Sequence, residues 1–213
     1  MLRNRVAVSV KRIGLHNIEP PIFYNCPVAI RFEIGDPMGE PYRKGKPSDA
    51  YVRPALQRVL AVYQNVRCTF DTMLWTIGSP QGSKKTEKEL LGCFCEIAKL
   101  SLPQERYLET MAPDDEQNVP EEKVWYYWDI DKRSANFEGL FEEIIKADLG
   151  GFAALASSVF LIDTNLNVLF YLYDDRGVDV AAESRDTIAP LYRSFGKWIL
   201  EHDRERIDKI FAD

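Results

Sequence analysis

The stretch V-F-L-I-D-T-N-L-N-V-L-F-Y-L-Y-D-D-R-G-V-D-V, residues 159–180, decides the fold. Its two apolar runs, Val159–Ile162 and Val168–Tyr173, flank the segment 163–167, which is rich in Asp and Asn. These residues favour turns because their side chains bond to nearby backbone and tolerate left-handed dihedral angles. The pattern predicts a β-hairpin. Since both strands are apolar on both faces, we expect the hairpin in the middle of a sheet that is covered on both sides.

The rest of the chain alternates between strand and helix patterns, without an internal repeat or a clear linker. Apolar residues that alternate or run unbroken predict three further strands, at residues 28–34, 68–77 and 123–130. Helical periodicity predicts helices at residues 2–13, from 50, at 87–100, at 137–148 and from 187. The first of these segments also fits a strand, but we favour the helix. We expect one α+β domain, residues 1–213, with a mixed, mostly antiparallel sheet of about five strands packed by helices.

Two regions have weaker patterns. Residues 35–48 contain several Gly and Pro residues, and residues 103–120 contain an acidic run, so both are expected to be loops.

In the last helix, Phe195 and Trp198 fall on the apolar stripe, which predicts that Trp198 lies in the core. The stripe changes phase at His202-Asp203, where we expect the helix to break.

The charges are unevenly distributed along the chain. The 213 residues carry a net charge of −6, but residues 1–53 contain nine Lys/Arg and five Asp/Glu, whereas residues 54–213 contain 18 and 28. An acidic chain lacks the basic footprint of a nucleic-acid-binding protein, so we expect no nucleic-acid partner. The acidic part could instead face a basic partner.

Cysteine usage and the termini indicate the compartment. The N-terminus lacks a signal-peptide pattern, and no stretch approaches the roughly 20 apolar residues of a membrane-spanning helix. The four cysteines are therefore expected to be reduced thiols of a cytoplasmic protein. Cys93 and Cys95 lie two positions apart in a predicted helix and so point to different sides, which argues against a shared metal. We expect no metal site and no cofactor.

Three stretches resemble a known family. They are P-P-I-F-Y-N-C-P-V-A-I-R-F-E-I-G at 20–35, Y-D-D-R-G-V-D-V at 173–180, and W-I-L-E-H-D-R-E-R-I-D-K-I-F at 198–211. In this order they resemble a bacterial family catalogued as domain of unknown function 3885. The resemblance implies a helix at the N-terminus and assigns no catalytic residue. Small acidic proteins of this kind are often encoded beside polymorphic toxins, which implies an immunity or partner-binding role by association.

The densest polar cluster follows the hairpin. In Asp174-Asp175-Arg176-Gly177, we expect Gly177 to supply a positive φ and Arg176 to pair with a neighbouring carboxylate. The alternative is a recognition or catalytic site at a sheet edge that includes Asp179. If the strand that ends at Asp129 and Asp131 lies beside this cluster, the carboxylates could bind a divalent cation for hydrolase or nuclease chemistry.

The leading expectation is a cytoplasmic partner-binding protein. It would be an immunity protein that neutralises a basic protein toxin encoded nearby, with the acidic side chains Asp114, Asp115 and Glu116 as a steering surface. The alternatives are a metal-dependent hydrolase or nuclease that uses Asp174, Asp175 and Arg176, and a regulatory domain that binds a small ligand. The leading expectation and these two alternatives can be distinguished by whether the aspartates converge around a cavity or lie spread over a convex surface.

Overall fold

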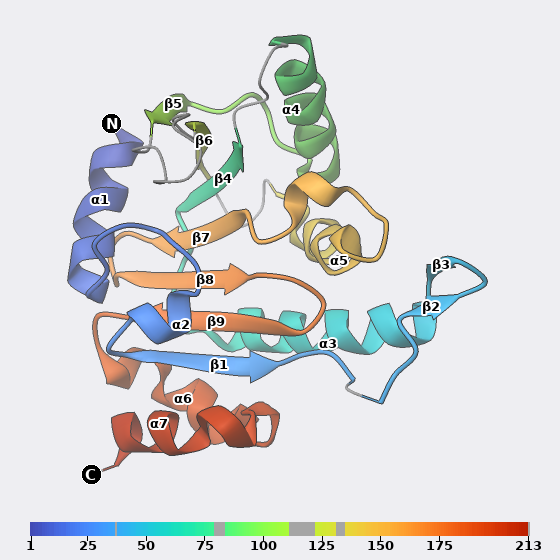
Figure 1. Ribbon diagram of the computed structural model, residues 1–213. Helices are drawn as coiled ribbons and strands as arrows, with labels where there is room; N and C mark the ends of the chain where they lie inside the picture. Colours follow the sequence, from blue (N-terminus) through green and yellow to red (C-terminus); the bar gives the residue numbers. More distant parts are fainter. Residues whose placement is uncertain (37, 79–83, 111–121, 131–134, 213) are drawn as a thin grey trace, which may run out of the picture.

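A seven-stranded sheet with helices on both faces forms the body of the protein (Figure 1). The computed structural model describes residues 1–36, 38–78, 84–110, 122–130 and 135–212. The strand order is β1-β9-β8-β7-β4-β6-β5, and every pairing among these strands is antiparallel. The α+β class is confirmed, and the sheet is larger than the predicted five strands. The strands are β1 (Ala29–Glu33), β4 (Thr72–Gly78), β5 (Glu105–Thr110), β6 (Glu122–Asp129), β7 (Val159–Asp163), β8 (Val168–Leu172) and β9 (Gly177–Ala182).

The predicted hairpin is confirmed as β7 and β8. All five residues of each strand are buried, and the two strands lie in the interior of the sheet. The Asp163 carboxylate accepts hydrogen bonds from the backbone N–H groups of Asn165 and Leu166, each at 2.8 Å, which closes the turn. The sequence pattern therefore identified the centre of the fold correctly, because burial on both faces requires two unbroken apolar strands.

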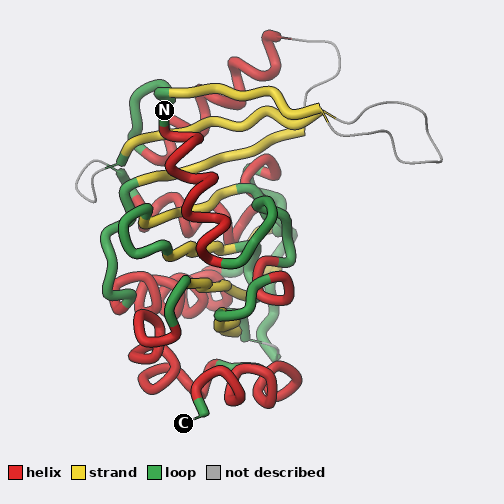
Figure 2. The backbone as a smooth tube through the Cα atoms, turned by 90° about the vertical axis from the view of Figure 1, so that its left-hand side faces the viewer, coloured by secondary structure: helices red, strands yellow, loops and turns green. Residues whose placement is uncertain are grey.

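Helices cover the two faces unequally. The helices α1 and α2 lie on one face, where they contact β6, β8 and β9, while α3 to α6 pack on the other (Figures 1 and 2). The helix α1 ends at Gly14, whose φ of 93° is left-handed, and α5 begins at Asn136, whose side chain accepts a bond from the Gly139 N–H. The helices are α1 (Leu2–Ile13), α2 (Ile22–Asn25), α3 (Asp49–Asn65), α4 (Lys84–Ala98), α5 (Phe137–Ala147), α6 (Arg185–Phe195) and α7 (Glu201–Phe211).

Aromatic side chains fill the layer between the sheet and the helices α3, α4 and α5. The ring of Tyr63 on α3 contacts those of Phe70, Phe137, Phe141 and Phe170 at centroid distances of 5.0 to 5.6 Å. Farther along the same face, Phe94 of α4 stacks between two tryptophans. Burial of rings of this size dominates core energetics, so this layer fixes the helices to the sheet. The stack consists of Trp75, Phe94 and Trp128, with centroid distances of 4.5 and 4.9 Å.

Several predicted boundaries were wrong. The strand β5 lies in the segment 103–120 that was expected to be a loop, and β9 was not predicted as a strand. The strand β4 begins at Thr72, later than predicted, and the loop 35–48 holds a small hairpin of β2 (Tyr42–Arg43) and β3 (Lys46–Pro47). Because β5 is an edge strand with mostly exposed side chains, it lacks the apolar face on which strand recognition depends.

The C-terminal helix is divided into three pieces. A 3-10 turn, Gly196–Trp198, separates α6 from α7, so the break comes before the predicted position at His202-Asp203. Trp198 lies in this turn and is half-buried, not in the core as predicted. Its ring stacks on Phe195 at a centroid distance of 4.7 Å. The apolar periodicity of the sequence continued across the turn and therefore concealed the break.

Candidate functional site

The three stretches that resemble the family meet in space. The strand β1, from the first stretch, pairs with β9, from the second, so that Arg31 lies opposite Asp179. The helix α7, from the third, contacts the α2 segment. The Tyr24 hydroxyl donates a 2.8 Å hydrogen bond to Asp203, and the Arg206 guanidinium donates to the backbone carbonyls of Tyr24 and Cys26. Segments far apart in the chain thus build one end of the molecule together.

Arg31 and Asp179 form the buried centre of this region. The Asp179 side chain is fully buried, and its two oxygens accept bonds from Arg31 Nε at 2.7 Å and Arg31 Nη2 at 2.9 Å. A third bond comes from the backbone N–H of Phe23 at 3.0 Å. Burial raises the pKa of Asp179, while the bonds and charge of Arg31 oppose that rise. Asp179 is therefore a structural partner of Arg31 and is not exposed to a ligand.

The turn between β8 and β9 carries the predicted polar cluster. Asp174 accepts bonds from the Arg176 backbone N–H at 2.7 Å and from Arg176 Nε at 2.8 Å, and Arg176 Nη2 also contacts it. The predicted local pairing of Arg176 is confirmed, and the bonds to Asp174 raise the pKa of the guanidinium. Gly177 does not have the predicted positive φ. It is needed for space instead, because an added Cβ would lie 1.9 Å from the Tyr173 hydroxyl.

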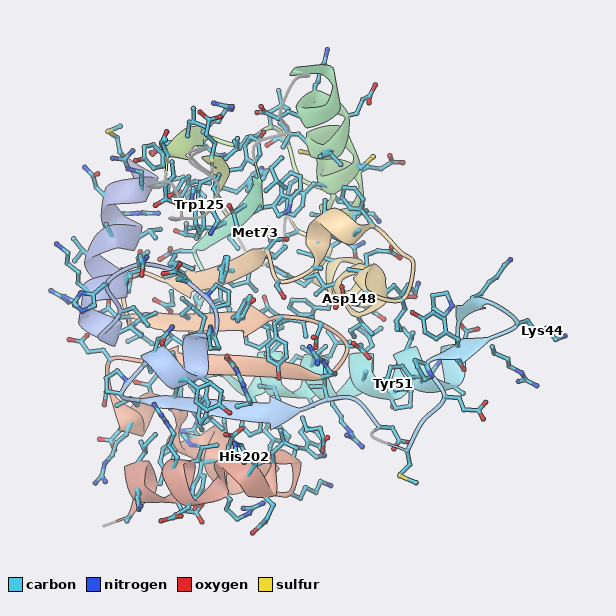
Figure 3. All side chains as sticks on the ribbon, in the orientation of Figure 1. Lys44, Tyr51, Met73, Trp125, Asp148 and His202 are labelled. Carbon is cyan, nitrogen blue, oxygen red and sulfur yellow. The ribbon has the colours of Figure 1, made fainter. Side chains whose placement is uncertain are left out.

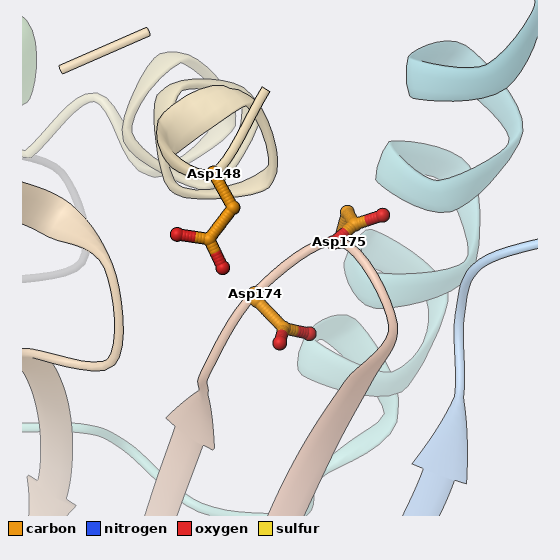
Figure 4. A group of neighbouring side chains, drawn as sticks. All are labelled: Asp148, Asp174 and Asp175. Carbon is orange, nitrogen blue, oxygen red and sulfur yellow. The ribbon is translucent and has the colours of Figure 1, made fainter. Parts of the chain in front are cut away.

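Two elements bring further polar groups to this turn. The Tyr51 hydroxyl of α3 donates a 2.5 Å bond to Asp175, and Asp148 follows the last residue of α5 (Figure 3). Oxygens of Asp148, Asp174 and Asp175 lie within 4.8 Å of one another (Figure 4). Burial, followed by the charges of Asp174 and Asp175, raises the pKa of Asp148. The fold thus holds three carboxylates together against their mutual repulsion.

A pocket of about 620 Å³ opens beside these carboxylates, and we call it the turn pocket. It lies between the turn, the end of β1 and the start of α3. The side chains of Tyr51, Asp175 and Arg176 line it together with residues of β1 and the following loop. The predicted cluster thus borders a cavity and is not spread over a convex surface, which is the arrangement expected of a binding site. The charged residues that line it are Arg31, Glu33, Asp36, Asp175 and Arg176.

The region of the turn pocket carries excess negative charge. Arg31 and Arg176 are each paired, with Asp179 and Asp174 respectively. Over the described ranges of the chain, no cationic side chain forms an ion pair with the remaining four carboxylates, Glu33, Asp36, Asp148 and Asp175. The Arg58 guanidinium, which donates a 2.9 Å bond to the Gly35 carbonyl, offsets one of these charges. The remaining imbalance favours a cationic ligand over an anionic one, because opposite charges attract at short range.

The three carboxylates are poorly arranged to hold a divalent cation without a rearrangement. Both oxygens of Asp174 already accept bonds from Arg176, and one oxygen of Asp175 accepts from Tyr51. A metal ion that used all three carboxylates would have to displace the Arg176 guanidinium. Asp129 does not assist, because register places it at the opposite end of the strands, near Arg5 at 3.7 Å.

The remaining predicted residues divide into two groups. Asp175 and Arg176 line the turn pocket and Asp174 pairs with Arg176 beside it, while Asp114, Asp115, Glu116 and Asp131 lie outside the described residues. Sequence reasoning missed Asp148, Tyr51 and Arg31. The sequence did contain a signal for Arg31, because this residue lies on the polar face of an otherwise apolar strand. Once that face is covered, the charge of Arg31 requires a partner.

Comparisons with known proteins agree with the resemblance. A family model described as domain of unknown function, DUF3885, matches residues 11–203, which include the first two stretches whole and residues 198–203 of the third. Among curated proteins, a 57-residue segment is 33% identical to the uncharacterized protein YnaE of Bacillus subtilis (strain 168), a match that spans 27% of each chain. No solved structure matches the chain. Among the described residues, no helix has the length and apolar character needed to cross a membrane.

Proposed function

We propose that this chain, which belongs to the family of the domain of unknown function DUF3885, is a partner-binding protein whose turn pocket receives a cationic side chain of another protein. The observation that carries the proposal is the excess of carboxylates at a concave site. Glu33, Asp36 and Asp175 line the pocket without a cationic partner in the described parts of the chain, and Asp148 adds a further charge beside it. A Lys or Arg side chain of a partner would neutralise this charge and relieve the repulsion on Asp148.

The partner that we propose is a basic protein toxin encoded nearby, with this chain acting as its cytoplasmic immunity protein. Toxins that act on nucleic acid tend to have basic clefts, because Lys and Arg favour phosphate binding. A chain of net charge −6 with an acidic pocket is electrostatically complementary to such a cleft. Insertion of one guanidinium or ammonium group into the turn pocket would anchor the complex, as buried Arg side chains do in many interfaces.

The test begins with co-expression and pull-down of the products of adjacent genes, followed by binding kinetics. Asp175→Asn keeps an acceptor for the Tyr51 hydroxyl but removes the charge, so we expect dissociation to become about tenfold faster or more. Glu96→Gln is the matched control, because Glu96 is exposed on α4, a helix that contributes no residue to the turn pocket. If no neighbouring product forms a complex, the immunity role is wrong. A complex that Asp175→Asn leaves unchanged would remove the turn pocket from the interface.

A second candidate is a metal-dependent hydrolase or nuclease, and the 4.8 Å cluster of carboxylate oxygens is the observation that favours it. Calorimetric titration with Mg²⁺ and Mn²⁺ distinguishes the two proposals. Stoichiometric binding that Asp148→Asn abolishes would favour the hydrolase. A separate titration with a small organic cation, in the absence of a protein partner, tests the third possibility. Binding in that titration would favour the regulatory ligand-binding domain.

A further inference from the structure

A second pocket, of about 220 Å³, lies at the β5–β6 end of the strand order, whereas the turn pocket lies at the β1–β9 end. We call it the α1 pocket. One wall is the helix α1, another is formed by the edge strand β5 and its neighbour β6, and the segment 16–19 closes a third side. Figure 2 shows α1 crossing the strands on the face where these walls meet. The side chains that matter most for its chemistry are Arg3, Lys11, Tyr107, Lys123, Trp125 and Tyr127.

Aromatic and aliphatic groups form the interior of the α1 pocket. Trp125 and Tyr127 alternate along β6 and therefore point to the same face, where both are largely buried (Figure 3 labels Trp125). Val6 and Val10 of α1 lie one turn apart on the helix and face them. These four side chains are only 3 to 7% exposed, so the contact area open to a planar ring comes mainly from Tyr107, which is 36% exposed, with Trp125 beneath it.

Cationic side chains surround this aromatic interior. In the parts of the chain that the structure describes, no carboxylate lies within 4 Å of the charged nitrogens of Arg3, Lys11 or Lys123. The Arg3 guanidinium instead lies over the Tyr107 ring, 4.0 Å from its centroid. Three cations without carboxylate partners around one pocket are notable in a chain of net charge −6.

The two carboxylates that line the α1 pocket are already engaged. Glu109 accepts a 2.6 Å hydrogen bond from the Trp125 indole N–H, and Glu19 accepts one from the Asn17 amide at 3.0 Å. Both donors are neutral, so these carboxylates keep their charge, and the lining holds three cationic side chains against two carboxylates. The start of α1 is also fixed to β5, because Glu105 accepts bonds from the backbone N–H groups of Leu2 and Arg3. The pocket is therefore preorganised, which lowers the entropic cost of binding.

We propose that the α1 pocket binds a planar aromatic anion, a single ring system that carries a carboxylate or a phosphate. The ring would lie against Trp125 and Tyr107, and the anionic group would be bound by Lys11, Lys123 and Arg3. Ammonium and guanidinium groups bind both kinds of anion. This inference does not depend on the partner proposed for the turn pocket, because the two sites share no lining residue.

The experiment measures binding of four probes to the whole chain by calorimetry and saturation-transfer NMR. Indole-3-acetate and phenyl phosphate supply the ring with each anion, indole-3-acetamide supplies a ring without charge, and inorganic phosphate supplies charge without a ring. We expect at least one of the ring-bearing anions to bind about tenfold more tightly than the amide, because several weak ion pairs add to the stacking contact. The tighter of the two identifies the anionic group. No binding of either at millimolar concentration would overturn the proposal, as would equal affinity for the amide or for inorganic phosphate.

Variants test the location of the site. Lys11→Gln should weaken binding about three- to fivefold. Arg12→Gln, which removes the same charge from the next position of α1 but does not line the pocket, should leave it unchanged. Ala7→Phe places a ring in the α1 pocket from an exposed helix position and should abolish binding, whereas Ala7→Ser should not. Equal effects of Lys11→Gln and Arg12→Gln, or full binding by a folded Ala7→Phe variant, would place the ligand elsewhere and overturn the proposal.

Discussion

Arg31 and Asp179 are 148 residues apart in the chain, yet they lie opposite each other in β1 and β9 and share two hydrogen bonds. The aromatic rings of Phe23, Tyr24 and Tyr173 surround the guanidinium, with centroids 4.8 to 5.2 Å from its central carbon. Burial lowers the pKa of Arg31, but the bonds to Asp179 and its charge outweigh that effect and raise the pKa above its ordinary value, so Arg31 stays charged. The pair connects the N-terminal strand to the C-terminal part of the sheet.

Removal of Arg31 should strongly destabilise the fold. Arg31→Ala leaves the Asp179 carboxylate buried without a counterion, for which we expect a loss of about 3–5 kcal/mol in the free energy of unfolding. Urea denaturation measures the loss, and Arg43→Ala, at an exposed position on β2, is the control that should change little. The double variant Arg31→Met with Asp179→Leu should recover much of the stability. A loss below about 1 kcal/mol for Arg31→Ala would show that the pair is not essential.

Arg176 should contribute less to stability than Arg31. Its side chain is 75% exposed, while that of Asp174 is 4% exposed. Arg176→Ala leaves Asp174 with the backbone N–H of residue 176 as a donor, so we expect a loss of about 1–2 kcal/mol in a denaturant melt. Arg193→Ala, an exposed arginine of α6, provides the baseline. If the melt and partner binding both stay unchanged, Arg176 has neither the structural nor the functional role.

Asp148 should make stability depend on pH. Its pKa is raised above the ordinary value of 3.8, so the folded protein binds a proton more readily than the unfolded chain. The wild type therefore loses stability as the pH rises from 3.8 through the folded-state pKa. Asp148→Asn lacks this loss. Below pH 3.8 the free energy of unfolding of Asp148→Asn should equal that of the wild type. At neutral pH it should exceed that of the wild type by less than about 1 kcal/mol, since the side chain is exposed to solvent.

Urea melts at about pH 3, 5 and 7 measure this difference. The control is Glu96→Gln, which removes an exposed carboxylate of α4, a helix that contributes no residue to the cluster, and should show no comparable trend. An Asp148→Asn variant that is less stable than the wild type at neutral pH would mean that the carboxylate makes a favourable contact there, and the repulsion argument would be wrong.

Trp198 should matter less than a core tryptophan. Trp198→Ala removes a half-buried ring that stacks on Phe195 and lies 5.9 Å from the Arg58 guanidinium carbon, so we expect a loss of about 1–3 kcal/mol. Trp75 is fully buried, and Trp75→Ala should cost about 3–5 kcal/mol. Denaturant melts of the two variants give the comparison. Equal losses would show that the turn at Trp198 is packed as tightly as the core.

The sequence predicts those parts of the fold that rest on a regular pattern. The hairpin β7–β8 has unbroken apolar runs, and α5 has both an apolar stripe and a capping asparagine. The strand β9 was missed because Asp179 interrupts a short apolar run, and only the position of Arg31 across the sheet makes that charge tolerable. The strand β5 was missed because an edge strand can be polar throughout.

The candidate site was predictable only where its residues are neighbours in sequence. The pairing of Arg176 with Asp174 is local and follows from the order of residues in the turn. Asp148 reaches the same place from the end of α5, and Tyr51 reaches it from α3. Neither carries a local signal, because their proximity depends on how the helices pack on the sheet. A carboxylate at the end of a helix is ordinarily a solvated surface group.

The last prediction concerns the acidic side chains Asp114, Asp115 and Glu116, and it depends on the proposed basic partner. Exposed charges accelerate association by attraction at long range, and salt screens this attraction over about 10 Å at 0.1 M. Replacement of the three residues by Asn, Asn and Gln should slow association and reduce its dependence on salt, with a smaller effect on dissociation. Stopped-flow kinetics at several salt concentrations measure both rates. The opposite pattern is expected for Asp175→Asn, since a charge that contacts the partner in a pocket acts mainly on dissociation. If the triple variant associates at the wild-type rate at low salt, the steering charge lies elsewhere on the chain, while the turn pocket would still be judged by its own dissociation rate.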